Sequence, residues 1–251
     1  MCENVCETAS ESPHNALYTD YFPSFLRVYP LLLAVVKRLC YNTFMLKVLL
    51  ANGSPHKEGC TYTALCEVAG ALNKNGVETE IFHIGQKAIS GCLACGFCRN
   101  AGFCAIDDAV AEFADIAVGV DGFVFGSPVH YASAAGAMIA FMDRLFYSAG
   151  RSFRGKPAAA VVSCRRGGAT ASFDQLNKYF SINQMPVVTS QYWNMVHGHT
   201  PDDVKRDLEG LQTMRTLGGN MAWLLKCIEA GKAAGIALPE NEAQVRTNFI
   251  R

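Results

Sequence analysis

MLKVLLANGSPHKEGCT, residues 45–61, is the stretch that decides how this chain folds. Leu46–Ala51 is a short apolar run, interrupted by Lys47, and it has the length of a strand buried in a parallel sheet. Asn52-Gly53-Ser54-Pro55 ends the run, because Gly and Pro in this arrangement mark a loop. The apolar residues of Thr61–Leu72 recur at helical spacing. The stretch therefore predicts a strand, a tight loop and a helix.

This loop has the makings of an anion site. The backbone N–H groups at the start of a helix are free, and the helix dipole favours negative charge there. Ser54 and Thr61 add hydroxyl donors, and His56 and Lys57 lie close by in the sequence. The composition suits a phosphate monoester, and an ordinary strand-to-helix connection is the alternative.

Two common phosphate-binding motifs are excluded. Gly53 and Gly59 lie one residue too far apart for the loop that binds nucleoside triphosphates, and Cys60-Thr61 stands where that motif requires Lys-Ser/Thr. G-x-G-x-x-G, the dinucleotide fingerprint, does not occur in the chain.

Length and charge narrow the class of protein. With 251 residues and 27.2 kDa, the chain is long enough for one sizeable α/β domain. The formal net charge is +0 and the pI about 7.0, so nothing in the overall charge favours nucleic acid or an acidic membrane. Of the 11 cysteines, four fall within Cys92–Cys104, which suits a metal site in a reducing cytoplasm better than a disulfide framework.

The first 44 residues differ from the rest. They begin acidic and then carry a brief apolar run, Val28–Val36. A signal peptide needs a basic start, and a membrane span needs roughly 20 apolar residues. We expect 1–44 to be an extension outside the fold and without a role of its own, with a membrane- or partner-binding arm as the alternative. The fold is expected over 45–235, and 236–251 as an exposed tail.

Gly91–Asp108, GCLACGFCRNAGFCAIDD, is the most specific segment. Its four cysteines, in the pattern C-x2-C-x2-C-x5-C, are Cys92, Cys95, Cys98 and Cys104. Compact runs of this kind are typical of [4Fe–4S] sites, which need four thiolates. Structural zinc also takes four thiolates, but normally in two separated pairs. A redox-active dithiol would need only two. The pattern favours the cluster and leaves zinc and free or redox-active thiols as alternatives.

Strands and helices alternate through the rest of the chain. Further strands are expected at Val77–Ile84, Asp121–Phe125, Lys156–Ser163 and Pro186–Ser190. Further helices are expected at Asp108–Val118, Ala132–Tyr147, Ala171–Phe180 and Asp202–Lys232, the last with a bend at Gly218-Gly219.

Two of these strands end in loops that resemble ligand sites. Gly126–Tyr131 places His130 and Tyr131 at a strand end, where an imidazole and an aromatic ring suit the flanks of a planar ligand. Cys164–Gly168 combines two arginines, donors for oxygen or ring nitrogen, with glycines that let a backbone approach a ligand. A plain loop and a pair of solvated arginines are the alternatives. His197-x-His199 has no carboxylate or thiol at a spacing that favours metal.

Together these elements predict a doubly wound five-stranded parallel sheet in the order 2-1-3-4-5, with helices on both faces. In such a sheet the three loops meet at the switch point, where FMN binds in proteins of this topology.

The same residues carry a resemblance to a family. GSPHKEGCT and GSPVHYASAAGAMIAFMDR resemble the flavodoxin-like NAD(P)H-dependent FMN reductases, over about 45–235. The cysteine segment resembles the iron–sulfur flavoproteins of that superfamily, and the match includes the x5 gap. The resemblance implies a [4Fe–4S] cluster on the four cysteines, a homodimer or homotetramer, and FMN contacts from Ser54, His56, Cys60, Thr61, Pro128, Val129, His130, Tyr131, Arg165, Arg166, Gly167 and Gly168.

The expected activity is centred on the flavin. FMN takes a hydride from NAD(P)H and passes electrons to a quinone, nitro, azo or flavin acceptor, while Arg165 or Arg166 stabilises negative charge on the reduced ring. One alternative is a relay of electrons between a ferredoxin-like partner and FMN through the cluster. Another is a flavin carrier or sensor without turnover. Neither a membrane nor nucleic acid is expected as a partner.

Overall fold

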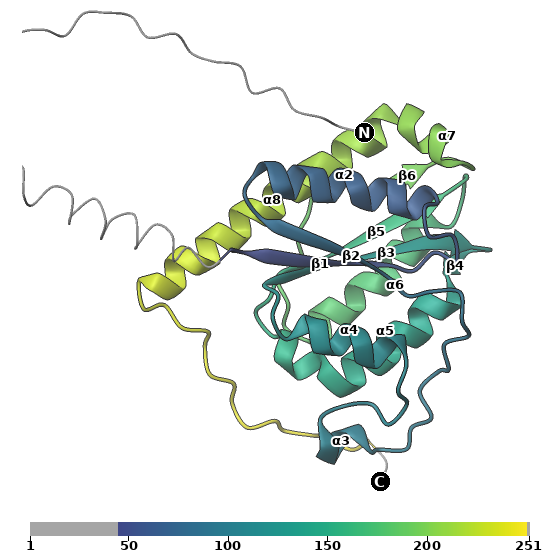
Figure 1. The fold of residues 1–251 in the computed structure, drawn as a ribbon. Helices are drawn as coiled ribbons and strands as arrows, with labels where there is room; N and C mark the ends of the chain where they lie inside the picture. The colour runs from purple at the N-terminus through teal and green to yellow at the C-terminus, as the bar shows by residue number, and fades with distance from the viewer. Residues whose placement is uncertain (1–44, 250–251) are drawn as a thin grey trace, which may run out of the picture. The chain divides into compact units, whose positions relative to one another are not determined.

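The computed structural model describes residues 45–249 (Figure 1). The expectation for 1–44 lies outside the described residues. Within them, no helix is long and apolar enough to cross a membrane.

The fold is built on one parallel sheet. Its strands lie in the order β2-β1-β3-β5-β6, and a two-residue strand, β4, pairs antiparallel with β3. Counted along the chain, the five parallel strands have the predicted order 2-1-3-4-5, and β4 is an addition. The strands are β1 Lys47–Asn52, β2 Glu78–His83, β3 Gly122–His130, β4 Ser133–Ala134, β5 Ala158–Cys164 and β6 Met195–His197.

Helices cover both faces of the sheet (Figure 1). The helices on one face are α2 Cys60–Lys74, α7 Pro201–Arg206 and α8 Leu208–Ala233. Those on the other are α4 Ala109–Ala117, α5 Gly136–Ala149 and α6 Ala169–Ile182, with a 3-10 turn at Gly150–Phe153. One four-residue helix, α3 Cys98–Ala101, lies in the cysteine segment, away from the sheet.

Alternate side chains of β1 point to opposite faces of the sheet, and this explains the two core layers. Val48 and Leu50 point into the core under α2 and α8, whereas Leu49 and Ala51 point into the core under α4 and α5. All four side chains are fully buried, as expected for a central strand of a parallel sheet.

The fifth strand lies later in the chain than the sequence predicts. Pro186–Ser190 forms only an isolated bridge, between Val187 and Ala158. Met195–His197 instead pairs with the end of β5, between Val162 and Cys164. The apolar run at 186–190 resembles a strand, but β6 is chosen by its tertiary contact with β5.

The last helical stretch is divided at Asp207 into α7 and α8, and α8 runs without a break through Gly218-Gly219. The Asp207 side chain accepts a hydrogen bond from the Gly210 N–H at 3.0 Å and so starts α8 as its N-cap. Gly218 serves the contact with α2, because a Cβ there would lie 2.7 Å from the Val68 carbonyl oxygen and the Ala71 Cβ.

The segment 126–134 also differs from expectation. β3 continues through His130, and its register pairs Pro128 with Ser163 of β5. A turn at Tyr131 then leads into β4, so the following helix begins at Gly136 rather than Ala132. The second ligand loop is therefore a β-hairpin.

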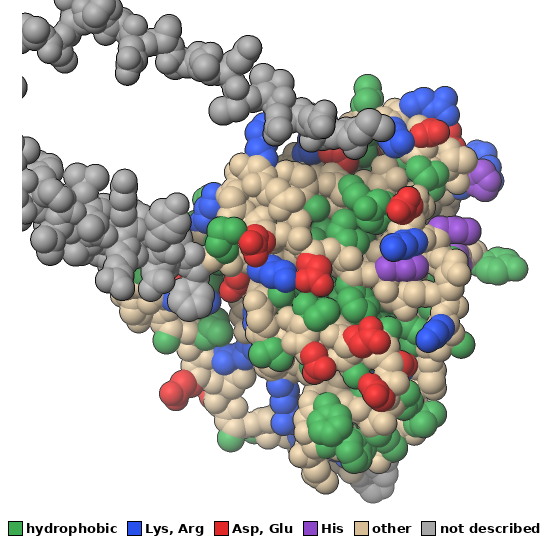
Figure 2. Space-filling view, viewed as in Figure 1, with side chains coloured by type: hydrophobic (Ala, Val, Ile, Leu, Met, Phe, Trp, Pro, Cys, Tyr) green, Lys and Arg blue, Asp and Glu red, His purple; other side chains and the backbone are tan. Residues whose placement is uncertain are grey.

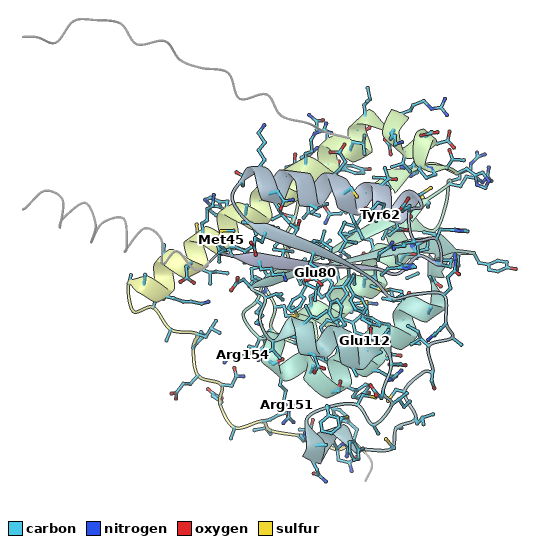
Figure 3. All side chains as sticks on the ribbon, viewed as in Figure 1. Met45, Tyr62, Glu80, Glu112, Arg151 and Arg154 are labelled. Atoms are coloured by element: carbon cyan, nitrogen blue, oxygen red, sulfur yellow. The ribbon has the colours of Figure 1, made fainter. Side chains whose placement is uncertain are left out.

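Residues 236–249 form neither helix nor strand and are exposed. They are nevertheless held, because Arg154, labelled in Figure 3, donates to the Pro239 carbonyl and to Asn241 Oδ1 (3.0 Å).

Candidate functional site

The loop after β1 is braced from inside by Asn52. This side chain is fully buried, and its Oδ1 accepts from the Ser54 N–H (3.1 Å) while its Nδ2 donates to the Lys57 carbonyl (3.0 Å). Ser54 Oγ in turn accepts from the His56 N–H at 3.1 Å. These bonds fix the loop backbone against the helix that follows it.

The end of β2 supports the same loop. His83 Nε2 lies 2.8 Å from the Ser54 carbonyl oxygen, and Gln86 Nε2 donates to the Pro55 carbonyl at 2.9 Å. None of Asn52, His83 and Gln86 was predicted as part of the site. All three stand at or just after the carboxyl end of a strand, and this position is the signal that could have identified them.

The start of α2 faces this loop. The N-cap residue, Gly59, has no side chain to cap the first amides of the helix, so those N–H groups remain available to an anion. Thr61 is buried, and its hydroxyl pairs with Ser163 Oγ at 2.8 Å, which ties the helix to β5. Figure 3 labels Tyr62, which follows Thr61 in the first turn of α2.

Cys60 turns toward the segment after β6. Its Sγ lies 3.8 Å from the Gly198 carbonyl oxygen. Burial, followed by the negative charge of Asp203, raises the pKa of the Cys60 thiol, although a hydrogen bond from its own backbone opposes the shift. Cys60 is therefore a neutral thiol beside the loop.

The second and third loops lie against each other. Gly168 has φ +86, and a Cβ there would lie 2.7 Å from Val129 Cγ1 and 3.1 Å from Ala132 Cα. Gly167, by contrast, has open space beside it. The glycine at 168 thus lets the β5 loop pack closely on the β3–β4 hairpin before α6 begins.

The polar side chains predicted for the site are exposed along this edge. His56, His130, Arg165 and Arg166 are exposed, and Tyr131 is fully so, with φ 56. Figure 2 shows histidines at the edge of the molecule where β4 and β6 lie in Figure 1. The structure therefore brings the three predicted loops to one edge of the sheet.

This edge fits FMN. Uncapped helix amides and the Ser54 loop suit a phosphate, and the hairpin 128–131 and the loop 165–168 offer an aromatic ring and two cations beside it. The residues therefore supply a site for each half of FMN: an anion site for the phosphate and a surface for the ring.

The four cysteines predicted as ligands line one cavity of about 60 Å³. Cys92 and Cys95 are exposed, Cys98 and Cys104 half-buried, and all four are free thiols. Left-handed backbone at Ala94 (φ 52) and Gly96 (φ 74) turns the segment around them.

No three His, Cys, Asp or Glu side chains in 45–249 converge closely enough to hold one metal ion. In a [4Fe–4S] cluster each thiolate binds a different iron, so its four ligands surround a volume rather than a point. Four thiols around one cavity fit that donor set and do not fit zinc as placed. His197 likewise pairs with Asp207 (Nδ1 to Oδ2, 3.7 Å) rather than with His199.

Arg144 of α5 is the residue that sequence reasoning missed here. Its side chain is 1% exposed and forms a bidentate pair with Asp108, with distances of 2.6 and 2.9 Å. It also donates to Cys104 Sγ (3.3 Å) and to the carbonyls of Ile106 (2.9 Å) and Ser90 (3.4 Å). Local periodicity gave no signal, because the partners lie 36–54 residues away.

The ion pair shifts both pKa values. Burial alone would raise the pKa of Asp108, but the hydrogen bonds from Arg144 and from the Val110 N–H outweigh it and hold the pKa below its usual value. The hydrogen bond to Asp108 raises the pKa of Arg144 against the opposing effect of burial. A buried guanidinium thus remains charged beside the cysteines.

A family model described as NADPH-dependent FMN reductase matches residues 46–200. An iron–sulfur flavoprotein of Methanocaldococcus jannaschii is 33% identical over 192 residues, 73% of this chain and 100% of the relative. An iron–sulfur flavoprotein of Methanosarcina thermophila is 27% identical over 194 residues, 74% of this chain and 99% of the relative.

Solved structures share the fold. RosB, solved with bound 8-demethyl-8-formylriboflavin-5'-phosphate, has a TM-score of 0.58 at 14% identity and covers 82% of this chain and 92% of its own. An NAD(P)H:quinone oxidoreductase from Methanothermobacter marburgensis has a TM-score of 0.54 at 16% identity, over 70% of this chain and 97% of its own.

Proposed function

This chain belongs to the NADPH-dependent FMN reductase family, in its iron–sulfur flavoprotein branch, and from that premise we propose that it oxidises NAD(P)H and reduces a small-molecule acceptor. Family membership makes it an FMN-dependent oxidoreductase. One observation carries the proposal: three loops, 52–61, 126–134 and 164–168, meet at the carboxyl edge of the sheet.

Each loop has its own task toward FMN. When bound, FMN supplies hydride acceptance and the release of electrons singly or in pairs. The amides at the start of α2 and the Ser54 loop hold the phosphate. Pro128, Val129, His130 and Tyr131 flank the ring. Arg165 and Arg166 offer positive charge to it, with Gly167 and Gly168 allowing close approach.

The [4Fe–4S] cluster belongs to the proposal as well. Cys92, Cys95, Cys98 and Cys104 would hold it, and the cavity that they share supports this assignment. The cluster would supply one-electron transfer beside the two-electron chemistry of a flavin.

One spectrum tests both cofactors. Protein purified without oxygen should show flavin absorption together with broad cluster absorption, and about four irons and matching sulfide per chain. Flavin without iron after anaerobic reconstitution would overturn the cluster assignment. Protein that takes up no FMN would overturn the site at the sheet edge.

Kinetics test the use of NAD(P)H. Residues 45–249 contain no second nucleotide-binding domain, so donor and acceptor should occupy one open site in turn. Parallel double-reciprocal plots with NADH or NADPH and a quinone are expected. Intersecting plots would show a ternary complex and contradict the shared site.

A relay from a ferredoxin-like partner is the second candidate. It is favoured by the exposed apolar side chains of the cysteine segment, Leu93, Phe97 and Phe103, which leave the cluster position open to a protein. A Cys98→Ser variant that keeps FMN and NAD(P)H oxidation but loses reduction by ferredoxin would favour the relay. A flavin carrier or sensor would catalyse neither NAD(P)H oxidation nor reduction by ferredoxin.

We also propose a cytoplasmic homodimer or homotetramer. The same exposed apolar residues support self-association, and the eight free cysteines among the described residues suit a reducing compartment. Light scattering after gel filtration tests the first point, and a monomer at micromolar concentration would overturn it.

A further inference from the structure

We propose that Arg144 is the positioning residue of the cysteine site, which fixes Cys104 and presents a hydrogen-bond donor and a buried positive charge to its sulfur. The inference rests on the cluster assignment proposed above. It concerns a residue outside the cysteine pattern, on the helix that packs beneath it.

The contacts of Arg144 close the whole segment. Its guanidinium reaches the Ser90 carbonyl before the first cysteine, and both the Ile106 carbonyl and the Asp108 carboxylate after the last. The two ends of an exposed loop are therefore held at one point. Without that point, Cys104 would have no fixed place relative to the three cysteines before it.

The hydrogen-bond count of the guanidinium is complete. It has five N–H donors, and five contacts are present: two to Asp108, one each to Ser90 and Ile106, and one from Nε to Cys104 Sγ. A residue that served only to pair with Asp108 would not need its Nε aimed at a thiol. Lysine, with one nitrogen, could not reproduce this fork.

Burial makes the charge effective. The side chain is 1% exposed, so water screens it little, and Asp108 pairs with Nη1 and Nη2 while Nε faces the Cys104 sulfur. Hydrogen bonds to ligand sulfur are among the features that set the potential of iron–sulfur sites. A donor and a cation at Cys104 favour the more negative, reduced form, and so raise the midpoint potential.

The test compares Arg144→Met and Arg144→Lys with Arg99→Met, a matched control in the same segment whose side chain is exposed. Each variant is purified without oxygen as the full chain, and its FMN content and far-UV circular dichroism verify folding. The readouts are the rate of iron release to a chelator and the midpoint potential from a spectroscopic titration.

Outer partners of metal ligands typically change metal affinity by about 10–100-fold. Arg144→Met should therefore lose iron about 10–100-fold faster than wild type, and its potential should be more negative. Arg144→Lys should keep its iron better than Arg144→Met but share the direction of the potential shift. Arg99→Met should match wild type in both readouts.

The outcomes separate the two proposals. A loaded wild type, with Arg144 variants equal to it in iron release and potential, would overturn the inference and leave the cluster in place. A wild type that takes up no iron would overturn the cluster proposal itself. If Arg144→Met does not fold, Asp108→Asn tests the same point, because it frees the guanidinium from its orientation, and unchanged iron release there would contradict the inference.

Discussion

The loop proposed to bind phosphate, residues 52–61 (the phosphate loop), and the cysteine loop, residues 90–108, are held in opposite ways. The phosphate loop starts from a buried central strand and is braced by its own Asn52 and by the neighbouring strand end at His83. The cysteine loop runs mostly exposed, contains one four-residue helix, and is closed from outside by Arg144.

This difference shows which site the fold itself supplies. The phosphate loop follows from the sheet, since any strand, tight loop and helix at that place would present free amides. The cysteine loop has little apolar burial of its own; the Arg144 guanidinium joins its two ends, and the proposed cluster would add to its order. We therefore expect the two sites to respond separately to mutation.

The largest effect should come from a ligand. Cys92→Ser removes one of four thiolates, so iron should fall from about four per chain to near none, and the segment 91–107 should become more sensitive to proteases. FMN content should stay at the wild-type level. Iron and flavin assays on one sample test this, and simultaneous loss of FMN would show that the two sites are not separate.

The next largest difference should be between glycine substitutions in the two loops, measured as the change in the free energy of unfolding. In Gly53→Ala the new Cβ would lie 2.7 Å from Met138 Sδ and 2.9 Å from the Gly126 carbonyl oxygen. We expect a loss of about 3 kcal/mol in unfolding free energy, because part of this clash is with backbone. Gly91→Ala is the matched change in the cysteine loop, and open space surrounds it. Its effect should stay within about 0.5 kcal/mol, and equal urea midpoints for the two variants would contradict the comparison.

Asn52→Ala should cost less than Gly53→Ala. It leaves the buried Ser54 N–H without its partner, at a cost of about 1–3 kcal/mol, whereas water can reach the carbonyl of the exposed Lys57. FMN should bind more weakly, since the loop that holds the phosphate loosens. The control is Gln86→Ala, which removes one exposed bond to the same loop. Calorimetric titration of FMN into both variants measures the difference, and equal affinities would argue against Asn52 as the brace.

Acid should loosen the cysteine loop. The pKa of Asp108 is lowered in the folded protein, so its carboxylate stabilises the fold above the ordinary value of 3.8, and this contribution is lost as pH falls through the lowered pKa. Pepsin cleavage of the iron-free protein near Phe97 and Phe103 should therefore increase as the pH falls through the lowered pKa of Asp108.

Asp108→Asn is the control, because its amide does not titrate. Its cleavage should be fast throughout the same range and show no such step. A wild-type profile without the step would mean that the Arg144 pair does not hold the loop.

The sequence predicted the parts of the fold that depend on local pattern. The strand predicted at 46–51 and the helix predicted at 108–118 follow from neighbours in the chain, and the structure has them as Lys47–Asn52 and Ala109–Ala117, with Asp108 as the N-cap. The predicted position of the fifth strand was wrong. The β-branched residues Val187, Val188 and Thr189 are typical of a strand, whereas Met195–His197 is selected by pairing with β5.

The candidate site shows the same limit. The three loops were found because each follows a strand, and the structure brings them to one edge. Arg144 was missed because its helix shows the spacing of core residues, and its partners are distant in sequence. A buried cation can be recognised only once those partners are in place.

The closure of the cysteine loop by Arg144 also bears on the entropy of cluster assembly. Bringing the ends of a flexible loop together has an entropic cost that grows with its length. Here the guanidinium already joins the segments at 90 and 106–108 in the folded protein. The proposed cluster would therefore bind to a ring of chain that is closed beforehand, and more of its binding free energy would remain to retain the metal.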